Sequence, residues 1–395
     1  MPKRATKRGA ERTPLTGRWD VLICGASFAG LAVARELRAS GARVLVIDRY
    51  EIGERQTSAC AAPTELLRNL GLEGSILQTF GELVVHTPQL SRRWPLPWTF
   101  STFDYRELCR LLWAQCGDAE FDIAKVDGRT SPFASHSASG AVPGDVTVHT
   151  DRGDLQAGLI VDALGWRRVL SGRASIQPPA ATLSRGLEVH PGGAADHLEL
   201  WLDTTYVTPG YSWSFPARDE VRIGVGSFDP RVRVKDPTVQ LVADVGRTPD
   251  GYQGNWIPHR LRAATEDGVF FVGDSAGHCL PTTAEGIRPA LYFGTLLGRE
   301  LADVVAGRQD RSEALARYGR LSAEHRVPFE CLFGVQQSIR HLHGPVLDTL
   351  TRLFSRRRVA HWAFRHYLGI CPPDAVLPTP PVAAPRPAEP VGAAA

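Results

Sequence analysis

Long apolar runs are missing from this sequence. No uninterrupted apolar stretch is long enough to span a bilayer, and the basic first 18 residues lack the apolar segment of a signal peptide. The seven cysteines show no paired spacing typical of a zinc site, and His278 beside Cys279 has no second ligand pair. We therefore expect a cytoplasmic protein from a reducing compartment, without a bound metal.

Net charge is also nearly absent. A formal charge of +3 on 395 residues gives no reason to expect a nucleic-acid partner. Residues 1–18 are rich in Lys and Arg and predict a disordered basic arm, and the Pro/Ala-rich residues 372–395 predict a disordered tail. The chain between them is apolar enough to bury a sizeable core, and it contains no internal repeat.

The most informative pattern that is present lies in residues 19–49. An apolar run ends at Gly25, a turn of small residues leads to Gly30 and a helical segment, and a second apolar run ends in Asp48. This order predicts strand, helix and strand around a dinucleotide-binding turn. Gly25 permits the tight turn, the small Ser27 lets backbone N–H groups approach a pyrophosphate, and Gly30 lets the helix lie close to the strand.

Asp48 follows Gly25 by 23 residues, close to the place where an acidic side chain accepts hydrogen bonds from a ribose hydroxyl. The turn alone leaves open which dinucleotide is bound.

Helical and strand patterns alternate in the rest of the chain. Residues 63–77 and 103–116 have helical spacing, whereas residues 145–150 and 158–164 predict strands. From about residue 183 the apolar residues alternate with polar ones, as in an antiparallel sheet.

Three segments resemble, in order and spacing, the FAD fingerprints of the p-hydroxybenzoate-hydroxylase-like flavoproteins. They are the turn at 25–30, VDALGWRR at 161–168 and GVFFVGDSAGHCLPTTAEGIRPA at 268–290. The likeness spans residues 19 to 310 and implies FAD at the first turn. It also implies an α/β fold, in which a Rossmann-type FAD-binding domain carries an inserted antiparallel-sheet substrate domain and is followed by C-terminal helices.

The resemblance implies an interleaved domain order. The FAD-binding domain would take residues 19–80, 101–180 and 261–310, the substrate domain a crossing at 81–100 and the sheet at 181–260, and the C-terminal helical region residues 311–371.

The resemblance further implies which residues surround the cofactor. Asp274 would approach the ribityl and pyrophosphate groups, and the turn at 281–286 would open a helix whose N-terminus faces the flavin pyrimidine edge. Arg106 occupies the place of an FAD-contacting arginine in this superfamily. The predicted cofactor-binding residues are Gly25, Ala26, Ser27, Ala29, Gly30, Asp48, Arg49, Arg106, Asp162, Gly165, Gly273, Asp274, Pro281, Glu285, Gly286 and Ile287.

Two details favour the geranylgeranyl-reductase-like branch of the superfamily. YSWSFP at 211–216 is similar to its YxWxFP motif, and DSAG at 274–277 with EGI at 285–287 looks like its GDAAG and GEGI. Cys60 sits where these reductases often have a cysteine beside the substrate cavity. The predicted catalytic residues are Cys60, Tyr211 and Trp213, and the predicted substrate-binding residues are Trp213 and Phe215.

These features predict an FAD-dependent oxidoreductase that reduces carbon–carbon double bonds of an apolar, isoprenoid-like substrate. Tyr211, Trp213 and Phe215 would share one strand face and form a wall along such a chain. Because the sequence has no second GxGxxG, NAD(P)H or another electron donor would act as a transient reductant. A flavin-dependent monooxygenase or halogenase, a cyclase and a non-catalytic flavin-fold binding protein remain alternatives, and the oligomeric state stays open.

A helical stretch near the C-terminus has features of a membrane-binding segment. Residues 345–370 combine helically spaced apolar residues with Arg356, Arg357, Arg358 and Arg365. This pattern is typical of a helix at a membrane surface, and more commonly of a helix packed on its own domain.

Overall fold

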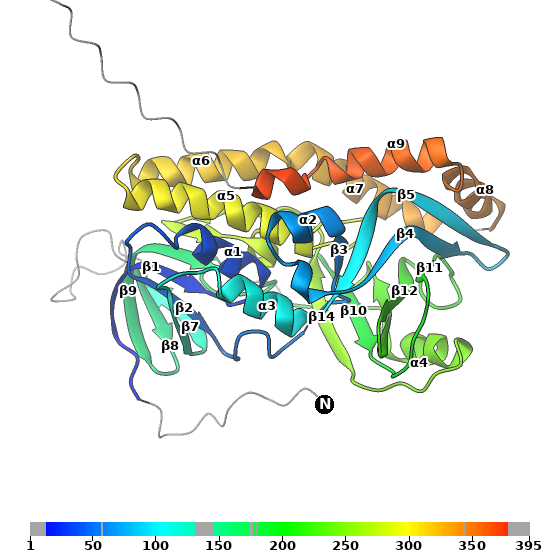
Figure 1. Cartoon of the computed structure of the whole chain (residues 1–395), viewed down its shortest axis with the longest axis horizontal. Helices are drawn as coiled ribbons and strands as arrows, with labels where there is room; N and C mark the ends of the chain where they lie inside the picture. The colour runs from blue at the N-terminus through cyan, green and yellow to red at the C-terminus, as the bar shows by residue number, and fades with distance from the viewer. Residues whose placement is uncertain are drawn as a thin grey trace, which may run out of the picture.

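The computed structural model describes residues 13–56, 58–130, 146–173, 177–178, 180–342 and 344–377. The disorder expected at 1–12 and 378–395 lies outside these ranges. In the described part, two sheets lie side by side, and a layer of helices that includes α5, α6, α7 and α9 runs along one side of both (Figure 1).

The first sheet is the predicted dinucleotide-binding sheet. Its main strand order is β15-β16-β9-β1-β2-β6, and β1, β2, β6, β9 and β16 pair in parallel. Parallel strands covered on both faces require apolar side chains throughout, and β1 accordingly ends in buried Val21, Leu22 and Ile23. The strands are β1 (Gly17–Cys24), β2 (Val44–Asp48), β6 (Glu120–Ile123), β7 (Val126–Thr130), β8 (Val146–Thr150), β9 (Gly153–Asp162), β15 (Thr265–Glu266) and β16 (Val269–Phe271).

Two helices meet at the carboxyl end of this sheet. Helix α1 (Phe28–Glu36) follows β1, and α5 (Ile287–Val305) packs directly against it. A Cβ atom on Gly294 would lie 2.7 Å from the Ala29 carbonyl oxygen, and one on Gly298 would lie 2.8 Å from that of Val33. The two backbones therefore approach closely only because α5 has glycine at these positions. Helix α3 (Tyr105–Trp113) packs on another side of α1.

The second sheet has the order β14-β10-β13-β12-β11-β4-β5-β3. Its strands are antiparallel except that β11 pairs with β4 in parallel. One face is covered by α4 (Lys235–Asp244), whose Leu241 and Val242 pack with Ile223 and Val225. The strands are β3 (Ala61–Pro63), β4 (Ile76–His86), β5 (Ser91–Phe103), β10 (Leu183–Val189), β11 (Leu198–Trp201), β12 (Gly210–Ala217), β13 (Glu220–Ser227) and β14 (Gln253–Pro258).

Strands β4 and β5 pair antiparallel within the second sheet from Ile76 to Phe103, and this pair includes the predicted substrate-domain crossing at 81–100. The helix predicted for 63–77 is correspondingly short and spans only Thr64–Asn69 (α2). The physical reason is Gly71, whose φ of 68° ends the helix in the left-handed conformation that glycine favours.

The C-terminal region is helical, with α6 (Arg311–Glu324), α7 (Arg326–Ser338), α8 (Gly344–Phe354) and α9 (Arg357–Leu368). The prediction of disorder from residue 372 is wrong for residues 372–377. A short 3-10 helix forms at Pro373–Val376, with Val376 buried, and the Asn69 amide donates to the Pro373 carbonyl (2.9 Å). Composition alone predicted a disordered tail here, because a Pro/Ala-rich sequence gives no sign of these tertiary contacts.

At the other end, the predicted disordered arm at 1–18 is wrong for its last residues. Strand β1 already begins at Gly17, and the Leu15 N–H donates to the Arg152 carbonyl (2.8 Å). Pairing with the chain next to β9 orders residues that have little apolar surface of their own.

Candidate functional site

The turn between β1 and α1 requires both of its glycines. Gly25 has a φ of 116°, and a Cβ atom on it would lie 2.3 Å from the Ala163 carbonyl oxygen. A Cβ atom on Gly30 would lie 1.9 Å from the Gly25 carbonyl oxygen. The turn therefore lies against its own helix and against the chain that leaves β9, which is the cradle expected of a pyrophosphate-binding turn.

Ser27 stands at the N-cap of α1, but its hydroxyl is used elsewhere. Its Oγ lies 3.1 Å from Tyr105 Oη on α3, and within the described chain it caps no N–H group of α1. The first turn of α1 thus keeps N–H groups that can donate hydrogen bonds to a phosphate. The Ser27 hydroxyl instead joins α1 to α3.

Asp48 at the end of β2 is fixed beside this turn. Its Oδ2 accepts from the Ala26 N–H (2.9 Å) and its Oδ1 from the Tyr50 N–H (3.2 Å). Burial raises the pKa of Asp48, and the two N–H donors oppose this rise. The turn, the helix start and this carboxylate fit the ADP end of a dinucleotide such as FAD.

Asp162, a predicted cofactor-binding residue, is held within the protein by three hydrogen bonds. Its carboxylate is fully buried and accepts from Ser275 Oγ (2.6 Å), the Leu164 N–H (2.9 Å) and the Leu170 N–H (2.8 Å). It therefore holds the loop after β9 against the 273–276 segment. Gly165 lies in that loop with a φ of 81°.

Asp274 lies where three predicted segments meet. A Cβ atom on Gly273 would be 3.1 Å from Ala29 Cβ in α1, and one on Gly286, the N-cap of α5, would be 3.5 Å from Asp274 Oδ1. Burial raises the pKa of Asp274 to about 6, and the guanidinium of Arg262 opposes this rise. The structure thus brings the start of α1, the Asp274 carboxylate and the start of α5 to one place.

The Glu285 carboxylate forms its contacts with other residues of the protein. It forms a two-point ion pair with Arg288 (both contacts 2.8 Å) and also accepts from the Tyr367 hydroxyl of α9. Arg288 is fully buried and donates to the carbonyls of Leu368 (3.0 Å) and Cys371 (2.9 Å). These contacts tie the loop before α5 to the C-terminal helices.

The other predicted cofactor residues occupy the rim or the core of this region. Arg106 and Arg49 are exposed, and Arg49 lies over the Tyr50 ring (4.9 Å). The backbone of Arg106 lies so close to Gly53 that a Cβ atom there would be 3.0 Å from Arg106 Cα. Ala29, Pro281 and Ile287 are buried.

The aromatic face, formed by Tyr211, Trp213 and Phe215 of β12, is turned toward the loop before α5. The Tyr211 hydroxyl donates to the Thr283 carbonyl, and the Tyr211 and Trp213 rings lie 5.9 Å apart. These side chains alternate with buried Ser212, which lies on the other face of the strand. The face predicted for substrate thus lies next to the segment predicted for the flavin.

Known proteins are similar to this chain in sequence. The FAD binding domain family matches residues 18–85 of this chain. Digeranylgeranylglycerophospholipid reductase 3 of Methanosphaera stadtmanae is 24% identical over 338 residues, which cover 78% of this chain and 83% of that protein. Reductase 2 of Methanothermobacter thermautotrophicus is 21% identical and covers 76% and 82%. The chain is an FAD-dependent oxidoreductase.

Solved structures show that this flavoenzyme shares its fold with several proteins. The geranylgeranyl bacteriochlorophyll reductase-like protein of Thermoplasma acidophilum superposes with a TM-score of 0.77 at 16% identity, covering 92% of this chain and 98% of that one. PqsL of Pseudomonas aeruginosa, a probable FAD-dependent monooxygenase, has a TM-score of 0.61 at 20% identity and covers 88% and 100%. The predicted fold class and the predicted FAD cofactor are therefore confirmed.

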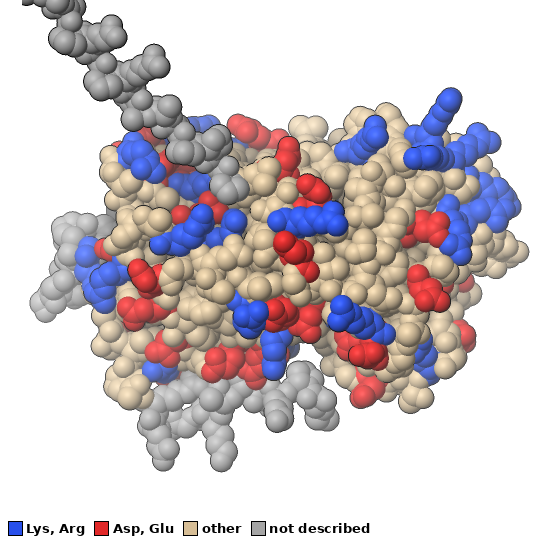
Figure 2. All heavy atoms as spheres, viewed as in Figure 1, with Lys and Arg blue, Asp and Glu red and all other residues tan. Residues whose placement is uncertain are grey.

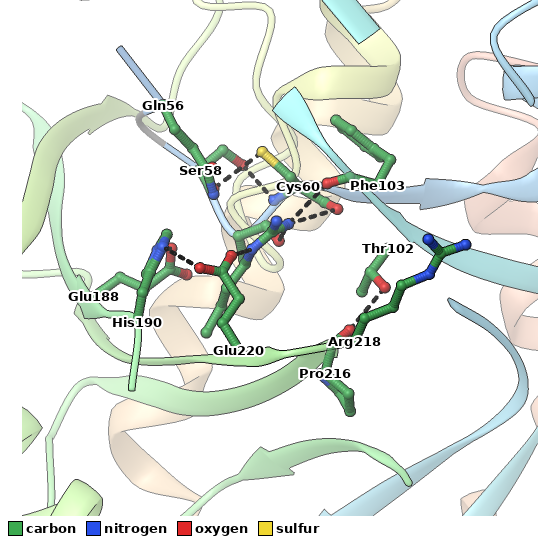
Figure 3. Close-up of polar contacts among 12 residues, drawn as sticks. Gln56, Ser58, Cys60, Thr102, Phe103, Glu188, His190, Pro216, Arg218 and Glu220 are labelled. Carbon is green, nitrogen blue, oxygen red and sulfur yellow. Dashed lines mark hydrogen bonds and ion pairs between the residues drawn. The ribbon is translucent and has the colours of Figure 1, made fainter. Parts of the chain in front are cut away.

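Cys60 lies beside Ser58, directly before β3 (Figure 3). It is fully buried with a φ of 54°, and its thiol donates to the Ser58 carbonyl (3.2 Å). Burial raises the pKa of the Cys60 thiol well above its ordinary value, so the thiol keeps its proton at neutral pH.

Several residues of this site gave no signal in the sequence. Arg288, Tyr367 and Ser275 act through contacts with residues far along the chain. The only local sign is the spacing of Glu285 and Arg288, three residues apart at a helix start. His278 packs in the helical layer, where its ring stacks on Phe293 (3.7 Å).

Proposed function

We propose that this flavoenzyme reduces carbon–carbon double bonds of an apolar isoprenoid chain. The observation that carries the proposal is the aromatic face of β12, which lies beside the loop before α5. An extended row of aromatic side chains suits a long apolar chain better than a compact polar one. The relatives named as digeranylgeranylglycerophospholipid reductases support the same substrate class.

The residues of the chain would bind and orient the substrate. Reduced FAD would supply a hydride to one carbon of the double bond, and a proton would complete the other carbon. Trp213 and Phe215 would hold the apolar chain, while the hydrogen bond from Tyr211 to Thr283 keeps the substrate face and the cofactor loop together. Burial raises the pKa of both Cys60 and Tyr211, so that each holds a proton at neutral pH.

An anaerobic turnover assay tests this function. The protein is loaded with FAD, reduced with dithionite or NADPH, and mixed without oxygen with a lipid that carries a geranylgeranyl chain. We expect a product heavier by two hydrogen atoms for each double bond, detected by mass spectrometry. Comparing the two reductants shows which donor the flavin accepts.

The same assay separates the alternatives. An absolute requirement for oxygen would replace the reductase with a monooxygenase or halogenase. Protein that stays colourless after addition of FAD would instead indicate a non-catalytic binding protein. A product isomerised without a gain of hydrogen would indicate a cyclase.

We also propose that α8 and α9 contact an anionic lipid surface while the rest of the protein stays in the cytoplasm. No helix of the described chain is both long and apolar enough to cross a membrane. Exposed apolar side chains on α8 and α9 include Val346 (56%), Leu353 (37%) and Trp362 (65%). Trp is favoured at the boundary of a bilayer because its ring is apolar and its N–H is polar.

The charge of this surface is complementary to such lipids. Basic side chains gather at the end of the molecule where Figure 1 places α8 and α9 (Figure 2). The two helices are described in full and contain a single acidic residue, Asp348, which is buried and accepts from Thr87 Oγ1 (2.6 Å). The exposed arginines of this surface are Arg352, Arg356, Arg357, Arg358 and Arg365.

Charge reversal at Arg357 and Arg358 should release the protein from vesicles. Each basic residue near an anionic surface contributes about 1 kcal/mol, so Arg357→Glu/Arg358→Glu should weaken binding at least about tenfold. Flotation with vesicles of phosphatidylglycerol measures this loss. Arg68→Glu/Arg320→Glu, on exposed positions of α2 and α6, is the matched control of equal charge. Equal loss in both variants, or no flotation of the unmodified protein, would disprove lipid contact at this surface.

A further inference from the structure

We infer that Glu188 is a positioning residue that fixes the indole of Trp213 on the substrate face and thereby sets the chain length that the enzyme prefers. This inference rests on the proposed function, since it concerns the residue that would hold the apolar chain. Glu188 is 4% exposed. Its Oε2 accepts from Trp213 Nε1 at 2.6 Å.

The two residues face one another across two strands. Glu188 of β10 pairs with Gly224 of β13, and Gly224 pairs with Trp213 of β12. Residues paired in this way lie in one row on one face of the sheet. The indole must therefore extend over the middle strand to reach the carboxylate, which it can do only where that strand has no side chain.

A glycine floor, formed by Gly186, Gly224 and Gly226, provides that space. A Cβ atom on Gly224 would lie 2.2 Å from Trp213 Cζ2, one on Gly226 3.3 Å from Cζ3, and one on Gly186 3.7 Å from Cη2. The ring thus lies along the sheet instead of standing up from it. The side of the indole ring that points away from the glycines is then available to contact a bound substrate.

Glu188 is held in place by a partly buried chain of alternating charges (Figure 3). Its Oε1 is 2.7 Å from His190 Nε2 and accepts from the Gln253 amide (2.7 Å). His190 Nδ1 lies 3.5 Å from Glu220, which accepts from Arg222 Nε (2.9 Å). Burial lowers the pKa of His190, but the two carboxylates together outweigh burial and raise it to about 9, so His190 carries a positive charge between them at neutral pH.

The charge chain ends at the loop that carries Cys60. Arg222 donates to the backbone carbonyls of Ala59 (3.0 Å), Cys60 (3.4 Å) and Phe103 (2.9 Å). One connected set of contacts therefore fixes both Trp213 and the Cys60 loop. Removing the carboxylate of Glu188 frees the indole to rotate and leaves His190 with one partner fewer.

A comparison of Glu188→Ala, Glu188→Gln and Glu199→Ala tests the inference. Glu199 is the matched control, because it also pairs with a histidine, His86 (3.1 Å), in the same sheet. It lies opposite Ser214 and so on the face away from Trp213. Glu188→Gln keeps an oxygen that can accept from the indole N–H and should retain most of the wild-type behaviour.

Two measurements report the effect. In the 15N–1H spectrum the indole signal of Trp213, assigned by its absence in Trp213→Phe, should move upfield in Glu188→Ala, because a charged acceptor is lost. In turnover with prenyl lipids of different length, KM for the longest chain should rise about tenfold in Glu188→Ala while kcat for the shortest chain stays unchanged. Glu199→Ala should change neither.

The outcomes separate this inference from the proposed function. An unmoved indole signal in Glu188→Ala, or the same loss of length preference in Glu199→Ala, would overturn the positioning role. If the unmodified enzyme reduces no prenyl lipid, the proposed function fails, while the indole signal still tests the contact. Should Glu188→Ala not fold, Glu188→Gln remains decisive, since replacing the charged acceptor by a neutral amide oxygen should still move the indole signal upfield, and an unmoved signal would overturn the inference.

Discussion

Replacing Gly25 by alanine should yield protein that is purified without FAD. The substitution places a Cβ atom 2.3 Å from the Ala163 carbonyl oxygen, and neither of these backbone segments can rotate away as a side chain would. The φ of 116° adds strain of about 1–2 kcal/mol for a residue other than glycine. The turn must shift, which moves its N–H groups out of hydrogen-bonding geometry with a pyrophosphate, so FAD binding should be lost. The ratio of flavin to protein absorbance measures the loss.

Gly41→Ala is the control for strain alone. Gly41 also has a positive φ, 74°, but no described atom lies within 4 Å of the position that its Cβ would take. This variant should lose about 1 kcal/mol of unfolding free energy and keep its FAD. If both variants lost the cofactor equally, overlap with Ala163 could not be the cause. Full occupancy in Gly25→Ala would contradict the assignment of this turn to FAD.

Replacing Arg288 by methionine should lower the unfolding free energy by about 3–5 kcal/mol, as expected when one partner of a buried ion pair is removed. The Glu285 carboxylate would stay largely buried without its cation, and the carbonyls of Leu368 and Cys371 would lose their donor. Because Tyr367 contacts the same carboxylate, α9 should loosen from the loop before α5. Denaturant titration followed by circular dichroism measures the change.

Two further variants sharpen this result. Arg110→Met breaks an exposed pair with Glu107 and should cost less than about 1 kcal/mol. Glu285→Gln/Arg288→Met removes both charges and should recover part of the loss, because no unpaired charge remains. A double variant no more stable than Arg288→Met alone would show that packing, not charge, explains the effect of Arg288.

The parts of the fold that the sequence predicted are those determined by local rules. Gly25 and Gly30 are required by a turn only a few residues long, and Asp48 ends the neighbouring strand, so their spacing is visible in one stretch of chain. The predicted helix at 63–77 was too long because helical spacing continues past Gly71, whereas the backbone does not. Local patterns therefore predicted the elements better than their ends.

The site beyond that turn depends on contacts between distant residues. Asp162 was predicted from its motif, but the sequence does not show that its carboxylate accepts hydrogen bonds from Ser275 and two backbone N–H groups. Ser27 was predicted only as a small residue that lets N–H groups approach a pyrophosphate, because its contact with Tyr105, 78 residues away, cannot be recognised in the sequence. The pairing of Glu188 with Trp213 needs the register of three strands, which alternation alone does not provide.

The glycine floor has a consequence for how this sheet can vary. Because the Trp213 ring fills the space that side chains at 186, 224 and 226 would take, the four positions share one volume. A smaller residue at 213 makes room for side chains on the neighbouring strands, and any side chain at 224 excludes a tryptophan lying flat. Among relatives of this chain these positions should therefore change together. A relative that has both a tryptophan at 213 and a side chain at 224 would need a different orientation of the tryptophan ring.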